Sequence, residues 1–211
     1  DLHSFPTRRS SDLRFFKCIM EGEEKCPHYD RVHPIVEKMQ NADGIIMTSP
    51  VYAMNVTGLL KNFFDHVAYF YHRPAFFTKK ALVIVTTAGA GDKDTAKYMD
   101  ETLRHCGVNK VYKITFKCGG KDSLDKEAID KVARKFAQDV ESKKLHSPKF
   151  MDIIFYDVWK RMALMEDPIE ADKKYWFETG LVNHDFAPEV KLGIVKKTFS
   201  KIMFAMLKRV M

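Results

Sequence analysis

The sequence predicts an α/β fold built on a parallel sheet. Short apolar runs that suit buried strands alternate with stretches whose apolar residues recur at helical spacing. The clearest strand covers residues 80–87 (KALVIVTT), which are continuous and rich in β-branched side chains, as in a strand buried on both faces. Strands separated by helices are typical of βαβ units, whose strands run parallel through right-handed crossovers.

Each element is expected from its own local pattern. Apolar runs ended by turn residues predict strands at 44–48, 80–87 and 111–116. A short helix over 33–40 is expected to begin at Pro34, and Gly107 is expected at the C′ position that ends the helix over 95–106. The other expected helices cover 57–71, 127–142, 150–165, 171–179 and 189–211.

The chain divides into three parts. Residues 1–13 (DLHSFPTRRSSDL) are polar and have no apolar period, and they resemble the translation of a sequencing-library adapter. We interpret them as an artefact and exclude them from fold reasoning. Residues 14–146 form the predicted α/β domain, and Ser147-Pro148 marks the boundary to a helical extension at 147–211.

Composition and charge limit the classes of function. The chain is 45% hydrophobic and 30% charged, which is ordinary for a globular protein. No apolar run approaches the roughly 20 residues that span a bilayer. Four irregularly spaced cysteines favour a reducing, cytoplasmic setting over a disulfide framework. The net charge of +7 does not predict nucleic-acid binding, because no basic cluster is interleaved with exposed aromatic residues.

Two loops at the carboxyl ends of consecutive strands are candidates for ligand binding. Residues 49–55 (SPVYAMN) follow the first strand, and residues 86–91 (TTAGAG) follow the second. Tyr52 offers a flat face with a polar tip, and the glycines of the second loop allow close approach to a planar ligand. Each loop alone also suits an ordinary turn. Their joint position favours a ligand, because open parallel sheets bind ligands at this edge.

The residues around both loops resemble a known family. Residues 42–66 (ADGIIMTSPVYAMNVTGLLKNFFDH) strongly resemble the third strand, loop and helix of the NAD(P)H-dependent FMN reductase family, in the flavodoxin-like superfamily. Residues 80–91 (KALVIVTTAGAG) resemble its fourth strand and second isoalloxazine loop. The resemblance runs from about Cys18 to Phe116 and implies a flavodoxin-like three-layer sandwich. It implies that FMN is lined on one side by Ser49, Pro50, Val51, Tyr52, Met54 and Asn55, and on the other by Thr87, Ala88 and Gly89.

The sequence departs from the family at its start. The family begins with a strand and a phosphate-binding loop, whereas nothing of that kind precedes Cys18, and neither G-x-G-x-x-G nor G-x-x-x-x-G-K-[ST] occurs in the chain. We therefore expect a flavodoxin-like sheet whose first strands are missing. The strand at 44–48 should then present an unpaired edge.

The resemblance implies an FMN-dependent oxidoreductase. Electrons would pass from NAD(P)H through FMN to a small acceptor, such as a quinone, a nitro or azo compound, or free flavin, and no catalytic acid or nucleophile is required. The alternatives are an iron–sulfur flavoprotein, a flavodoxin-like electron carrier and a flavin-free partner-binding module. A carrier would show an acidic docking rim, whereas this chain is basic. We expect a homo-oligomer.

Two further features are open to more than one interpretation. Cys18 and Cys26 flank an acidic turn, but an iron–sulfur cluster needs several closely spaced thiolates, so we expect unligated cysteines in a cap over the flavin. Residues 189–211 form a basic amphipathic helix with Val195, Phe199, Ile202, Met203, Met206 and Val210 on one face. That face could bind an anionic membrane. We favour packing against the domain or a second subunit, because such stripes usually face a core.

Overall fold

Within the described residues, the protein has one sheet of three parallel strands. The computed structural model describes residues 16–118 and 125–210, so the segment 1–13 lies outside the described residues. The strands are β1 (Gly44–Pro50), β2 (Lys80–Thr87) and β3 (Lys110–Lys117), in that spatial order and with Ile45 opposite Ala81. The predicted α/β class with a parallel sheet is confirmed, and each strand ends within two residues of its predicted position.

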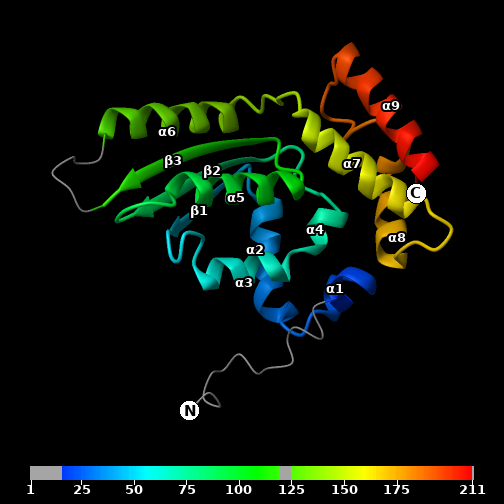
Figure 1. Ribbon diagram of the computed structural model, residues 1–211, viewed down its shortest axis with the longest axis horizontal. Helices are drawn as coiled ribbons and strands as arrows, with labels where there is room; N and C mark the ends of the chain where they lie inside the picture. Colours follow the sequence, from blue (N-terminus) through cyan, green and yellow to red (C-terminus); the bar gives the residue numbers. More distant parts are fainter. Residues whose placement is uncertain (1–15, 119–124, 211) are drawn as a thin grey trace.

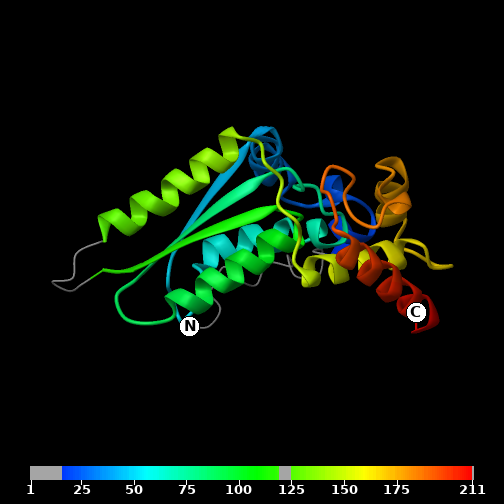
Figure 2. The same cartoon turned by 90° about the horizontal axis from the view of Figure 1, so that it is seen from above.

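Helices cover both faces of the sheet (Figures 1 and 2). On one face, α6 (Lys126–Glu141) packs Phe136 against Leu82. On the other face lie α2 (Tyr29–Asn41), α3 (Gly58–His66) and α5 (Asp92–His105), which enclose the main core around Val83. Successive residues of β2 point to opposite faces, and both faces are covered, so this strand is apolar almost throughout.

One side of β1 remains open. Ile46 is 61% exposed, although the residue beside it on β2, Leu82, is buried. Helix α6 packs on β2 and β3. Ile46 and Thr48 of β1 remain exposed to solvent. No strand pairs with the outer side of β1 within residues 16–118 and 125–210. In this part of the chain β1 is therefore an edge strand, as predicted.

The predicted start of the helix at 33–40 was wrong. Helix α2 begins at Tyr29 and contains Pro34, which was expected to begin it. The first turn forms because the amides of Arg31 and Val32 both donate to the carbonyl of His28, so the helix is established before the proline is reached. The missing N–H of Pro34 then removes a single later hydrogen bond.

The single helix expected over 57–71 is divided in two. Helix α3 begins after Thr57, whose side-chain oxygen accepts a hydrogen bond from the amide of Leu60 at 3.3 Å. Val67 leaves the helical region, with φ −103° and ψ 15°, and a short helix α4 (Tyr69–His72) follows. The break turns Phe70 into the core.

The remaining helices agree broadly with expectation. Gly107 follows α5 with φ 99°, as predicted for a C′ glycine. The last helix begins at 194 instead of 189, because residues 187–190 form a separate turn closed by a hydrogen bond from Val190 to Ala187. The other elements are α1 (Phe16–Met20), η2 (Glu23–Lys25), α7 (Phe150–Ala163), α8 (Glu170–Glu178), η3 (Leu181–Asn183) and α9 (Ile194–Val210), of which α1 and the two 3₁₀ turns were not predicted.

The C-terminal helices pack at the end of the sheet where the strands begin (Figures 1 and 2). Their own core contains the fully buried Trp176 and Ile153, and it includes Phe77, which lies just before β2. The loops at the carboxyl ends of the strands lie at the opposite end of the molecule. None of the helices in the described residues is long and apolar enough to cross a membrane.

Candidate flavin site

The loop after β1 contains a strained turn. Tyr52 and Asn55 exchange backbone hydrogen bonds of 2.9 and 3.0 Å, which close a two-residue turn over Ala53 and Met54. Both central residues have left-handed backbones, with φ 48° and 65°. Turns of this shape normally have asparagine or glycine at the two central positions, because most other residues are strained at positive φ. Such strain is concentrated at ligand and active sites, which makes this turn a candidate binding element.

Ser49 shapes this loop from within. Its side chain is buried, its hydroxyl donates to the carbonyl of Pro50 at 2.8 Å, and its Oγ accepts from the amide of Thr57 at 3.1 Å. Asn55 similarly accepts a hydrogen bond from the amide of Val56 through Oδ1, at 2.8 Å. Of the residues predicted to line a flavin here, Tyr52 and Met54 present the most exposed large side chains, at 65% and 59%.

The loop after β2 is also held from within. The hydroxyl of the buried Thr87 donates to the carbonyl of Ala90 at 2.9 Å and accepts from the amide of Gly89 at 3.2 Å. Residues Ala88, Gly89 and Ala90 are exposed. The amide of Gly89 is therefore already hydrogen-bonded within the loop. In residues 16–118 and 125–210, the amides of Ala88 and Ala90 have no hydrogen-bond acceptor and can donate to a ligand.

Gly91 brings the two loops into contact. Its φ is 88°, and a Cβ atom at this position would lie 3.0 Å from Cγ1 of Val51 and 3.2 Å from Cα of Met54. A Cβ at Gly89, in contrast, would meet nothing within 4 Å. Gly91 therefore allows the close approach between the loops, and the space beside Gly89 is open to a ligand.

The sheet places these features side by side. Pro50 lies opposite Thr86 in the β1–β2 pairing, and the amide of Val51 donates to the carbonyl of Thr86 at 2.7 Å. One exposed surface therefore contains an aromatic ring at Tyr52, a flexible thioether at Met54 and the free amides around Gly89. An apolar face with a few amide donors suits a flat heteroaromatic ligand that carries carbonyl oxygens.

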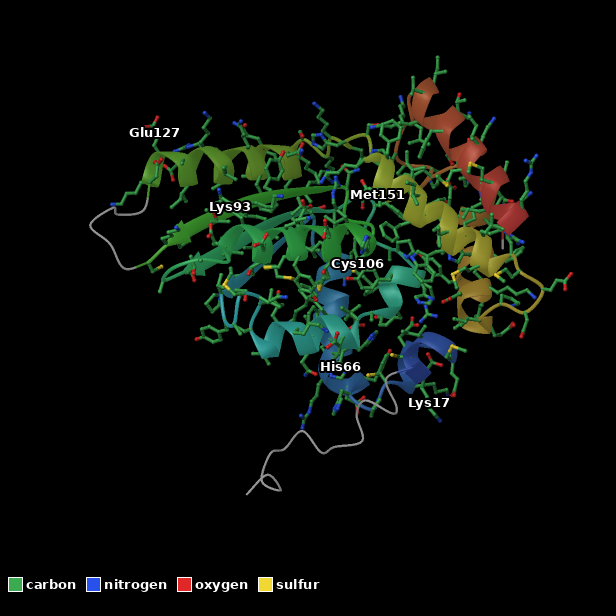
Figure 3. The ribbon with its side chains drawn as sticks, in the orientation of Figure 1. Lys17, His66, Lys93, Cys106, Glu127 and Met151 are labelled. Carbon is green, nitrogen blue, oxygen red and sulfur yellow. The ribbon has the colours of Figure 1, made fainter. Side chains whose placement is uncertain are left out.

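A second group of polar side chains surrounds Cys26. Its Sγ lies 3.6 Å from Nδ1 of His66, which is labelled in Figure 3. The His66 ring makes an edge-on contact with the ring of His28, with 4.8 Å between the ring centres. Burial lowers the pKa of His66. Burial also raises the pKa of Cys18, and the nearby Cys26 raises it further. Both effects favour an uncharged thiol and an uncharged imidazole at neutral pH.

Among the residues that the structure describes, this group does not form a metal site. In the described residues, no three His, Cys, Asp or Glu side chains lie close enough together to hold a metal ion. Arg73 instead fixes the segment that contains Cys18. Its buried guanidinium donates to the carbonyls of Cys18 and Ile19 at 2.7 and 3.0 Å and to the carboxylate of Asp172 at 2.9 Å.

Sequence reasoning did not identify three of these features. Gly91 stands in the same A-G-A-G stretch as Gly89, but only the backbone shows which of the two glycines contacts the first loop. The left-handed turn over Ala53 and Met54 has no signature, because neither residue favours that conformation. The contact between Cys26 and His66 joins residues 40 positions apart and has no sequence pattern.

Several proteins are similar to this chain. It is 28% identical over 173 residues to an iron-sulfur flavoprotein from Archaeoglobus fulgidus, a match that covers 78% of this chain and 76% of that protein. It is 26% identical over 176 residues to an iron-sulfur flavoprotein from Clostridioides difficile, covering 79% and 74% of the two chains. A crystal structure of an NADH:FMN oxidoreductase in its apo form aligns over 63% of this chain and 67% of that chain, with 25% identity and a TM-score of 0.41.

The family model for NADPH-dependent FMN reductase matches residues 3–122. This range contains all three strands and both loops of the candidate site, and it begins within the segment that lies outside the described residues. The match extends over more than half of the 211 residues. Together with a parallel sheet enclosed by helices, it confirms the flavodoxin-like assignment, and the chain belongs to the NADPH-dependent FMN reductase family.

Proposed function

We propose that this protein takes electrons from NADH or NADPH and passes them to a small acceptor, such as a quinone, a nitro or azo compound, or free flavin. FMN-dependent oxidoreduction is the activity of the family to which the chain belongs. The observation that carries the proposal is the surface formed by the strained turn after β1 and the exposed loop after β2. Gly91 holds these two loops in contact.

The residues at this surface fit FMN. The Tyr52 ring would contact the flat face of the isoalloxazine, and Met54, which can adapt its shape, would fill the space beside it. The amides of Ala88 and Ala90 would donate to ring carbonyl oxygens, beside the open space at Gly89. When bound, FMN supplies the redox chemistry by accepting an electron pair from the reduced nicotinamide and releasing it to the acceptor.

The remaining residues hold this surface in place. The hydroxyls of Ser49 and Thr87 hydrogen-bond within their own loops, and both residues are buried. They therefore act as positioning residues that stabilise the shape of the loops. The strain at Ala53 and Met54 persists because the pairing of Tyr52 with Asn55 holds the turn closed before a ligand arrives.

The test measures flavin binding and nicotinamide oxidation together. We expect the 211-residue protein to quench the fluorescence of added FMN and to oxidise NADH or NADPH when FMN and menadione are present. Tyr52→Ala should weaken binding, whereas Phe177→Ala, which removes an exposed aromatic ring from α8 at the other end of the molecule, should not. Absence of both flavin binding and NAD(P)H oxidation would contradict the proposal. If the two variants bind FMN equally well, the flavin ring does not lie against Tyr52.

Comparing the affinities for FMN and riboflavin tests whether this chain binds the phosphate group of FMN. Neither phosphate-loop motif occurs in the sequence. We therefore expect FMN and riboflavin to bind this chain with similar affinity, since the loops described above contact only the ring. An FMN affinity that exceeds that of riboflavin by orders of magnitude would show that this chain has a phosphate site, because hydrogen bonds to a charged group contribute about 1.5–3 kcal/mol each.

A second candidate function is that of an iron–sulfur flavoprotein. It is favoured by the names of the relatives from A. fulgidus and C. difficile, which match about three quarters of this chain. The described residues do not fit a cluster by themselves, because their His, Cys, Asp and Glu side chains gather no three-ligand group. Iron and sulfide analysis of protein purified without oxygen distinguishes the candidates. A stoichiometric cluster would favour the second.

A further inference from the structure

Helix α9 is attached to the rest of the protein by one face. The hydroxyl of the buried Ser200 lies 3.0 and 3.2 Å from the two carboxylate oxygens of Asp157 on α7. The ring of Phe204 lies 4.8 Å from Nζ of Lys160, which is also on α7. These contacts, four residues apart along α9, fix how the helix is rotated about its axis.

That rotation leaves a second apolar face in solvent. Val195, Ile202, Met206 and Val210 follow one another at intervals of seven, four and four residues, so they share one face of the helix. Each is between 56% and 84% exposed, and we call these four residues the exposed stripe. Of the residues on the predicted apolar face, only Phe199 and Met203 are partly buried, so the expected packing of this face is limited to these two.

The apolar surface continues onto α7. The ring of Phe199 lies 4.9 Å from that of Phe150, at the start of α7. Phe150 and the adjacent Met151 are both exposed. Figure 3 labels Met151 near the start of α7. Scattered apolar side chains on a surface are ordinary, but a continuous stripe along a helix of 17 residues, joined to a neighbouring helix, is characteristic of an interaction site.

The charged side chains of the last 22 residues, 190–211, are all positive. From residue 190 to the last residue, 211, the chain has six cationic side chains and no aspartate or glutamate. Lys196 donates to Ser147 and to the carbonyl of Pro148, so it serves the packing of the helix. The other five, Lys191, Lys197, Lys201, Lys208 and Arg209, are exposed. In the described part of the chain, none of these five forms an ion pair within 4.0 Å.

We propose that α9 binds the surface of an anionic lipid bilayer. The exposed stripe would enter the boundary between headgroups and acyl chains, and the long cationic side chains on the other sides of the helix would reach toward lipid phosphates. Charge complementarity favours lipid over a second copy of this chain. In a symmetric dimer the two copies of α9 would bring their cations close to each other, with no carboxylate on either helix to neutralise them.

The arrangement of the molecule is compatible with this role. Helix α9 and the loops at the carboxyl ends of the strands lie at opposite ends of the sheet (Figures 1 and 2). A bilayer in contact with α9 would therefore leave the candidate flavin site open to solvent. The proposal does not depend on the proposed redox function.

The test is flotation of the 211-residue protein with vesicles. We expect the protein to rise with vesicles of phosphatidylcholine containing about 30% phosphatidylglycerol, and not with vesicles of phosphatidylcholine alone. Binding should fall steeply in about 0.5 M NaCl, because salt screens exposed charges. Ile202→Ser/Met206→Ser should reduce the partition coefficient at least about tenfold, since both side chains leave solvent on binding. Both are exposed in the free protein, so the circular dichroism spectrum should not change.

Charge variants separate a specific surface from general attraction. Each lysine or arginine near an anionic surface contributes roughly fivefold to partitioning. Lys197→Gln/Lys201→Gln/Arg209→Gln should therefore bind about a hundredfold more weakly than the wild type.

The matched control loses the same charge on α6. Its substitutions are Lys126→Gln, Lys131→Gln and Lys135→Gln, all at exposed positions, and it should bind nearly as well as the wild type. Equal losses in the two triple variants, binding that is independent of anionic lipid, or no binding would overturn the proposal. So would a wild-type dimer that becomes monomeric in Ile202→Ser/Met206→Ser, measured by light scattering, because the stripe would then be a subunit interface.

Discussion

Gly91 offers a sharp test of how the two loops of the candidate site depend on each other. Alanine at this position would keep φ near 88°, where a residue other than glycine costs on the order of 1 kcal/mol or more. Its Cβ would also lie 3.2 Å from Cα of Met54, a backbone atom that can move only with its loop. Overpacking of this kind costs about 1–3 kcal/mol. We therefore expect Gly91→Ala to lower the free energy of unfolding by about 2–4 kcal/mol.

The effect should appear in both stability and binding. With a denaturant slope of about 2 kcal/mol per molar, the midpoint of urea unfolding, followed by circular dichroism, should fall by roughly 1–2 M. The same variant should bind FMN about tenfold more weakly in a fluorescence titration. The physical reason is that Val51 and Met54, which a methyl group would displace, belong to the loop that offers Tyr52.

Gly89→Val is the matched control within the same loop. Gly89 is not left-handed, and nothing lies within 4 Å of a Cβ at this position, so its stability should change by less than about 0.5 kcal/mol. A valine there would occupy the space assigned to the flavin ring, and FMN affinity should fall. The coupling between the loops is refuted if Gly91→Ala keeps the wild-type midpoint and affinity. The position of the ring is refuted if Gly89→Val binds FMN normally.

Three other predictions test separate parts of the structure. Tyr52→Ala should cost roughly 1 kcal/mol of FMN binding, whereas Tyr52→Phe should retain most of it, as measured by fluorescence titration. Burial raises the pKa of Asp157 to about 7, so its contribution to stability is complete below about pH 4 and is lost as the pH rises through 7. Between pH 5 and pH 8 the free energy of unfolding, measured in urea, should therefore fall by about 2–3 kcal/mol more in the wild type than in Asp157→Asn. Equal losses in the two proteins would contradict this. Ile46→Lys should slow aggregation, measured by light scattering, without lowering the unfolding midpoint, because the side chain is already exposed on an edge strand. Faster aggregation or a lower midpoint would show that Ile46 is packed in solution.

The strands were predictable because the burial of a strand determines which amino acids it contains. Residues 80–87 are covered on both faces by helices, so nearly every position had to be apolar, and the predicted bounds agree with those observed. Helix ends were less predictable. Pro34 favours a helix start, but the hydrogen bonds to the carbonyl of His28 begin α2 five residues earlier. Proline at such a position is compatible with either outcome, and local sequence does not distinguish them.

The position of the candidate site was predictable, whereas its internal geometry was not. Strand order and the two loop motifs placed residues 49–55 beside residues 86–91. The sequence does not show that the hydroxyls of Ser49 and Thr87 point into their own loops, because a serine or threonine can equally donate to a ligand. The roles of these residues and of Gly89 toward FMN remain predictions.

The environment of the cysteines depends on distant parts of the chain. A buried guanidinium is costly unless it is paired and hydrogen-bonded, and the two terminal nitrogens of Arg73 donate to the carbonyls of Cys18 and Ile19 and to the carboxylate of Asp172. His72 adds a contact of 2.8 Å from Nδ1 to the other carboxylate oxygen of Asp172. Because Asp172 belongs to α8, loss of this helix would remove the buried carboxylate that pairs with Arg73 at 2.9 Å and leave it the more exposed Glu23 at 3.6 Å, which would weaken the anchor of the segment that contains Cys18. The extension therefore contributes to the position of the cysteines through contacts about 100 residues apart, which no local pattern could have indicated.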